Sequence, residues 1–250
     1  MNAGRLDPEF DPRLVEAAVL EALRGHAGER DFHAEREVLY DIVEPEPREA
    51  AFEALHARWF GRLALDRAFH RALAEHPEIA ARCRRCLVAR ARGRREEVAD
   101  LLVAPDERPT LVVLVTPGTV AVPERLHVFL RRELLRVGDM LDPGFGYDPA
   151  PPAGVAGGAW ERPVRDAYRV LWDAYVDGRL VRRGVLPATA RRDRLGDFVR
   201  AFRHLGADAE AAFERFFGGQ RLTHAELLAF TARRPHGGVA GPRRQAAGAE

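Results

Sequence analysis

Three charged residues in one short segment have the types and the spacing to do chemistry. Arg132 and Arg136 are four residues apart, with Glu133 between them, in the segment Arg132-Glu133-Leu134-Leu135-Arg136. In a helix, positions i and i+4 share one face, and two histidines there would bind one zinc ion while the glutamate polarises a zinc-bound water. Arginine has no lone pair to donate and stays protonated, so Arg132 and Arg136 cannot bind zinc.

The order of segments around this motif resembles that of zincin-like metallopeptidases of the gluzincin type. Residues 98–180 contain an expected strand hairpin, the motif helix, a loop, and then an acid pair four residues apart. The resemblance implies that Arg132, Arg136 and Asp173 stand at the three metal-ligand positions and that Glu133 stands at the position of the general base. It also implies that Asp177 stands at the position of an acid in the second shell, which orients a metal ligand. Arginine replaces both histidines, and aspartate replaces the more usual glutamate in the acid pair.

We predict that the two guanidinium groups replace the charge of the metal. Glu133, Asp173 and Asp177 would then neutralise Arg132 and Arg136 through charge-assisted hydrogen bonds. No metal or other cofactor is expected. The resulting hypothesis is a pseudoenzyme, a peptidase scaffold that has lost zinc and activity and binds an extended peptide or protein segment.

Three other interpretations stay open. The chain could be an active metal-dependent hydrolase with Glu133, Asp173 and Asp177 as an unconventional ligand set. It could be a helical regulatory or nucleic-acid-associated protein that uses the arginines of residues 82–95. No aromatic side chain alternates with these arginines, so we do not expect nucleic acid as a partner. The two motifs could also be accidental spacings on the exposed helices of a plain helical protein.

Hydrophobic periodicity predicts an α+β fold that is mostly helical. The motif helix is expected over residues 123–142, with Pro123 at its first position. Apolar runs at 98–103 and 110–115 predict a small antiparallel sheet beside it, to which 119–122 is expected to add a short strand. Further helices are expected at 13–24, 48–75, 77–93, 163–178, 191–205, 207–217 and 224–233.

The predicted organisation is one zincin-like domain over residues 13–235. It has a helical N-terminal part, a core with the motif helix and the acid-pair helix, and C-terminal helices, at 13–97, 98–180 and 181–235. A flexible N-terminus at 1–12 and a disordered tail at 236–250 flank this domain. The loop 142–163 is rich in Gly and Pro and is expected to be irregular.

The composition excludes several classes of enzyme. All 39 Lys and Arg side chains are arginine, and the chain contains no serine. A serine nucleophile, a Schiff-base lysine and a P-loop lysine are therefore excluded. The formal net charge of +1 gives no general attraction to nucleic acid or membranes. The apolar runs are too short to span a bilayer and no secretory signal is visible, so we expect a cytoplasmic protein without a membrane partner.

Cys83 and Cys86 form a C-R-R-C segment inside the expected helix 77–93. No second cysteine pair or nearby histidine completes a zinc site. We therefore expect two small apolar side chains packed on a helix in a reducing compartment.

Overall fold

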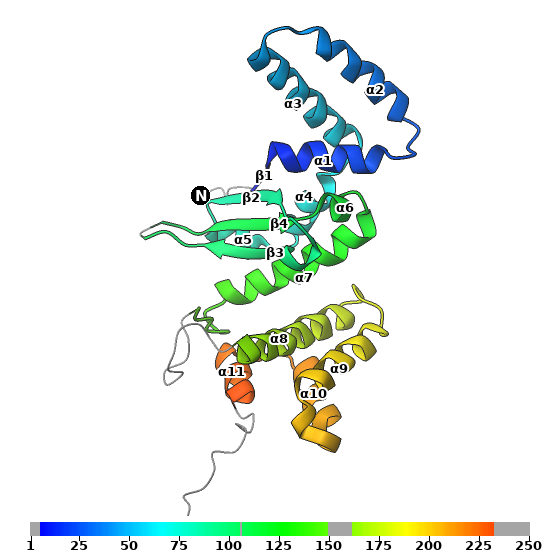
Figure 1. Ribbon diagram of the computed structural model, residues 1–250. Helices are drawn as coiled ribbons and strands as arrows, with labels where there is room; N and C mark the ends of the chain where they lie inside the picture. The colour runs from blue at the N-terminus through cyan, green and yellow to red at the C-terminus, as the bar shows by residue number, and fades with distance from the viewer. Residues whose placement is uncertain (1–5, 106, 150–161, 233–250) are drawn as a thin grey trace, which may run out of the picture. The chain divides into compact units, whose positions relative to one another are not determined.

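A computed structural model of the protein describes residues 6–105, 107–149 and 162–232. The fold is α+β and mostly helical, with a small mixed sheet, so the predicted fold class is confirmed at this level (Figure 1). The contacts divide the chain into two compact units, 1–147 and 148–250, instead of the single domain expected over 13–235. We call these unit 1 and unit 2.

The sheet of unit 1 has the strand order β1-β2-β4-β3. Its strands are β1 (Pro8–Phe10), β2 (Arg85–Arg90), β3 (Val98–Leu102) and β4 (Thr110–Val115). The predicted hairpin is confirmed, because β3 and β4 pair in antiparallel fashion with Ala99 opposite Val113. The prediction of a purely antiparallel sheet is wrong, because β2 runs parallel to both β1 and β4. Parallel strands need a crossover connection, and the turn residues that indicate a hairpin in the sequence do not reveal such a connection.

Strand β2 lies where the sequence predicts the second half of a helix. The expected helix 77–93 is wrong beyond Arg82, because α5 (Pro77–Arg82) ends there and a central strand follows. A central strand carries a short continuous apolar run, here residues 86–89, which periodicity alone cannot distinguish from a buried helix. β1 lies within residues 1–12, which we expected to be flexible, and its pairing with β2 orders it.

Several helices of unit 1 begin at a capping residue or with a proline in the first turn. The Asp11 carboxylate accepts hydrogen bonds from the N–H groups of Arg13 at 2.7 Å and Leu14 at 3.3 Å, which starts α1. The long helix expected over 48–75 is two helices, separated near Ala64, whose φ of 56° is left-handed. The helices of unit 1 other than α5 are α1 (Pro12–Leu23), α2 (Glu29–Glu37), η1 (Val38–Asp41), α3 (Pro45–Arg62), α4 (Arg67–Ala74), η2 (Arg94–Glu96), α6 (Pro117–Val120) and α7 (Pro123–Leu141).

The motif helix predicted over 123–142 is therefore confirmed as α7. The short strand predicted at 119–122 is wrong, because Thr116 caps the helical turn α6 there with its side-chain oxygen. α7 packs against β3, α4, α5 and α6, while α1 packs against β2, α3 and α6. These contacts place the buried apolar face of α7 beside the edge strand β3 (Figure 1).

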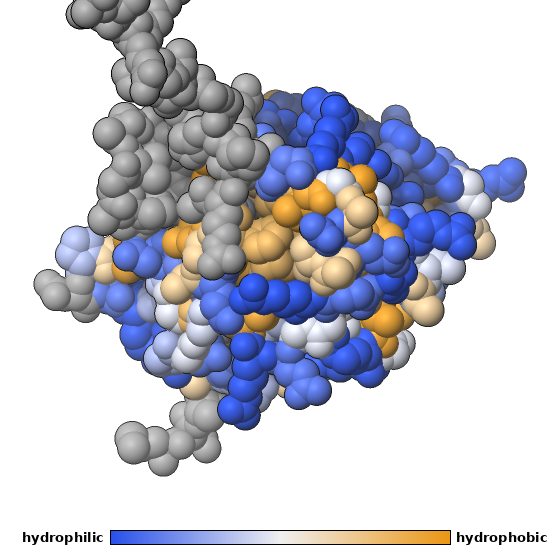
Figure 2. Space-filling model, turned by 90° about the horizontal axis from the view of Figure 1, so that it is seen from below, coloured by the Kyte–Doolittle hydropathy of each residue, from blue (hydrophilic) through white to orange (hydrophobic). Residues whose placement is uncertain are grey.

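Unit 2 consists of helices in the part that the structure describes. They are α8 (Arg162–Arg182), α9 (Ala190–Ala201), η3 (Arg203–Asp208), α10 (Ala209–Phe217) and α11 (His224–Ala232). Its core contains aromatic rings in tilted and edge-to-face contact, among them those of Phe198, Phe202, Phe216 and Phe230. The surface seen in Figure 2 carries a group of apolar residues, in orange, bordered by hydrophilic ones.

A capping box starts α11, because the Thr223 N–H donates to Glu226 at 2.9 Å and the Glu226 N–H donates to the Thr223 hydroxyl at 3.2 Å. The prediction that Gly178 ends its helix is wrong, because α8 continues to Arg182. The expected tail 236–250 and most of the expected loop, residues 150–161, lie outside the described residues.

Candidate functional site

The motif lies on the face of α7 that turns toward the core of unit 1. Leu126, Leu130, Leu134 and Val137 recur every three or four residues and are buried, as expected for an amphipathic helix. Glu133 belongs to the same buried region, with only 7% of its surface exposed. Burial of a carboxylate without partners is costly, so its partners decide what this site can do.

Both oxygens of the Glu133 carboxylate have a partner. Oε1 accepts a hydrogen bond from Arg136 Nη1 at 2.6 Å, and Oε2 accepts one from the backbone N–H of Ala99 at 3.1 Å. Arg136 is 8% exposed, so this is a buried ion pair between residues one helical turn apart. Arg132, the other motif arginine, is half-buried.

The Ala99 donor belongs to the edge strand of the sheet. The next alternate residue of β3, Leu101, donates its N–H to the Asp100 carboxylate at 2.8 Å. Alternate N–H groups of an edge strand point away from the sheet and are available to a further strand. In β3, two of these donors are occupied by carboxylates, one from α7 and one from the strand itself.

The acid pair of the predicted site lies on α8 in unit 2. Asp177 is buried, and its Oδ2 accepts a hydrogen bond from Arg194 Nε of α9 at 2.6 Å. Arg194 Nη1 lies 3.8 Å from Asp173 Oδ2 and 3.1 Å from Asp197 Oδ2. Burial acts to lower the pKa of Arg194, but the three carboxylates outweigh it and raise this pKa above its usual value. Arg194 is therefore a permanent cation that holds the two α8 aspartates together.

Sequence reasoning missed two members of these sites. Arg194 forms an i,i+3 ion pair with Asp197, which is a recognisable local signal, but nothing in the spacing connects it to residues 17 and 21 positions earlier. The Ala99 N–H is a backbone donor and leaves no signal in residue type. Only the packing of β3 beside α7 identifies it.

The structure brings Glu133 to Arg136 in unit 1, and Asp173 to Asp177 in unit 2. The predicted neutralisation of Arg132 and Arg136 by the α8 aspartates would join the two units. That pairing stays a prediction.

A zinc ion does not fit the residues at the motif. The guanidinium of Arg136 occupies one side of the Glu133 carboxylate and has no lone pair with which to bind a cation. Within residues 6–105, 107–149 and 162–232, no three His, Cys, Asp or Glu side chains are grouped so that they could hold a metal ion. Arg136 thus places a cation beside the Glu133 carboxylate.

The two cysteines of the C-R-R-C segment do not share a helix, which corrects that prediction. Cys83 follows α5 and Cys86 lies in β2, and both are free and buried. Burial raises the pKa of both thiols, in Cys86 to about 12 with a further contribution from Cys83 nearby. Thiolate is the reactive form, so both cysteines are expected to be inert.

This expectation is tested by alkylation. Iodoacetamide at pH 8 should modify neither Cys83 nor Cys86 in the folded protein, and both in urea, as followed by mass spectrometry of the peptides. Rapid modification of Cys86 in the folded protein would contradict its inert character.

The arginines of residues 82–95 do not lie on one helix, because the helix expected over 77–93 ends at Arg82. They are spread over α5, β2, η2 and the connections between them. Two of them are paired with acids, since Arg84 Nη1 lies 2.5 Å from Glu107 Oε2 and Arg85 Nε donates to Glu9 Oε1 at 2.9 Å. Pairing of this kind reduces the charge that a phosphate backbone would meet.

Comparison of the chain with models of protein families, with curated proteins and with solved structures finds no match. No helix within the described residues has the length and apolar content needed to cross a membrane.

Proposed function

We propose that this chain is a zincin-like protein that has lost zinc binding and peptidase activity and binds an extended peptide or protein segment. The observation that carries the proposal is the buried pair of Glu133 and Arg136 on α7. Glu133 occupies the position of a zincin general base, and a fixed guanidinium stands beside it where a ligand to the metal would be expected.

The chemistry of hydrolysis requires a polarised water next to the glutamate. A metal ion accepts the lone pair of such a water and increases its acidity, whereas a guanidinium can only donate hydrogen bonds to it. The Glu133 carboxylate is also engaged by Ala99 and Arg136. These features favour binding over catalysis.

The peptide is proposed to pair with the later part of β3. The Ala99 donor is held by the buried Glu133, but the Leu101 donor is held by Asp100, which is exposed and easily displaced. Leu102 and Val103 follow, with 63% and 70% of their surfaces exposed, and would give apolar contacts. Strand addition uses this combination of main-chain hydrogen bonds and side-chain contacts.

The experiment that tests the lost zinc site restores the two histidines. The double variant Arg132→His, Arg136→His is expected to bind about one equivalent of zinc, as measured by calorimetry and metal analysis. Adding Asp173→Asn should weaken that binding by at least about tenfold if Asp173 is the third ligand. The wild-type protein, purified without chelator, should contain no stoichiometric zinc.

A matched control is the pair Arg67→His, Arg71→His, which places two histidines at the same spacing on the exposed side of α4. This pair should bind zinc more weakly than the motif pair. Equal affinities would mean that the motif spacing is accidental, and a full equivalent of zinc in the wild-type protein would refute the proposal.

A further inference from the structure

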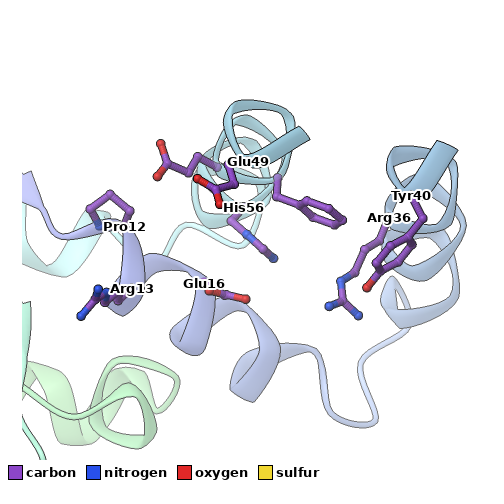
Figure 3. Close-up of a pocket in the computed structure, with 9 residues that line it drawn as sticks. Pro12, Arg13, Glu16, Arg36, Tyr40, Glu49 and His56 are labelled. Carbon is purple, nitrogen blue, oxygen red and sulfur yellow. The ribbon is translucent and has the colours of Figure 1, made fainter. Parts of the chain in front are cut away.

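Unit 1 contains a cavity of about 320 Å³ between α1, η1 and the helices α2 and α3 (Figure 3). It lies apart from α7, and none of the motif residues lines it. Its volume is at the lower end of the range for small-molecule pockets, about 300–1,000 Å³.

Two residues that line this cavity each have a buried side-chain nitrogen without a hydrogen-bond partner among the described residues. These nitrogens are Nε2 of His56 on α3 and Nε of Arg36 on α2. His56 is only 5% exposed, and Figure 3 shows its imidazole directed into the space between the helices. Buried polar atoms nearly always have a partner, so two unsatisfied atoms on residues that line one cavity indicate a missing ligand group.

Aromatic rings form one wall of the cavity and hold these donors in place. The Arg36 guanidinium carbon lies 5.6 Å from the centre of the Tyr40 ring and 5.8 Å from that of Phe52. The Phe52 ring is stacked on His56, with centres 6.4 Å apart and planes inclined by 24°. A flat apolar group would find a complementary surface there.

The charges around the cavity are mixed. Arg13 and Arg36 line it together with Glu16, Glu49 and Glu53, so acids exceed bases by one. Burial lowers the pKa of His56, Arg36 lowers it further, and Glu16 opposes them, so the imidazole is neutral at pH 7. The cavity thus offers hydrogen-bond donors to an anion and carboxylates to a cation.

We infer that this cavity binds a small zwitterion with a flat apolar group, namely a free aromatic α-amino acid. Its carboxylate accepts hydrogen bonds from Arg36 Nε and from His56 with its proton on Nε2. Its ammonium group faces the glutamates, of which Glu16 points toward Arg36 across the cavity in Figure 3. Its ring packs beside Phe52 and Tyr40.

The test uses three probes with the same phenyl group and different ionic groups. L-phenylalanine carries an ammonium and a carboxylate group, phenethylamine only the ammonium group, and 3-phenylpropionate only the carboxylate. Binding to the full chain is measured by calorimetry and by saturation-transfer NMR. L-phenylalanine should bind most tightly, because only it satisfies both the donors and the acids. Arg36→Met keeps the contact with the rings and should weaken the binding of L-phenylalanine by at least about tenfold, while the binding of phenethylamine is not weakened.

Arg30→Met on the same helix is the control, because Arg30 is exposed and does not line the cavity. It should leave all three affinities unchanged, and far-UV circular dichroism verifies that both variants are folded. Glu16→Gln is a second, surface-exposed variant that should weaken phenethylamine and L-phenylalanine but not 3-phenylpropionate. Absence of millimolar binding, equal binding of the three probes, or an unchanged L-phenylalanine affinity in Arg36→Met would overturn the inference.

Discussion

Replacement of Arg136 by methionine is expected to lower the free energy of unfolding of unit 1 by about 3–5 kcal/mol. Methionine keeps most of the buried volume but leaves the Glu133 carboxylate inside the protein without its cation. The remaining hydrogen bond from Ala99, at 3.1 Å, cannot neutralise that charge. Urea unfolding followed by the fluorescence of Trp59, the one tryptophan in the sequence of unit 1, measures the change.

Two further variants separate the ion pair from general damage to α7. Arg125→Met removes an exposed arginine from the same helix and should change the free energy by less than about 0.5 kcal/mol. The double variant Glu133→Gln, Arg136→Met removes both charges and should be more stable than Arg136→Met alone. If the double variant instead loses the sum of the losses measured for Arg136→Met and for Glu133→Gln alone, the pair is not coupled.

Gly178→Ala is expected to destabilise unit 2 by about 3 kcal/mol or more. A Cβ atom at position 178 would lie 1.9 Å from the carbonyl oxygen of Phe217 and 2.8 Å from its carbonyl carbon. These are backbone atoms of α10, so the whole helix would have to move. The same movement would break the hydrogen bond of 2.6 Å that Arg182 Nη1 donates to the Phe217 oxygen. Urea unfolding followed by circular dichroism tests this.

Gly196→Ala is the matched control within unit 2. Gly196 lies inside α9, and a Cβ there would contact only the Arg200 side chain, at 3.5 Å. This substitution should stabilise the protein by about 0.5–1 kcal/mol, since alanine loses less backbone entropy in a helix. A similar loss of stability in both glycine variants would mean that the contact with Phe217 is not the cause.

The elements that follow from local spacing could be predicted from the sequence. α7 is an example, because Pro123 starts it and buried leucines recur every four residues. β2 could not be predicted, because its central position depends on residues far away in the chain. The same holds for Gly178, where glycine serves the approach of another helix and not the end of its own.

The candidate site likewise has contacts that could be predicted from the sequence and contacts that could not. The spacing of Glu133 and Arg136 is sufficient to predict that they can pair on one helix face, and their contact at 2.6 Å follows from it. The role of Ala99 and the capture of Asp177 by Arg194 depend on packing between separate elements. No residue type in the sequence reveals them.

The parallel pairing of β1 has a consequence for how the chain folds during synthesis. Glu9 of β1 lies opposite Leu87 of β2. The first strand therefore cannot join the sheet until β2 and the helices between β1 and β2 have been made. Contacts that are this distant in sequence form slowly, because the closure of a long loop must precede them. β1 is therefore expected to be among the last strands to enter the sheet, and until then β2 presents an open edge.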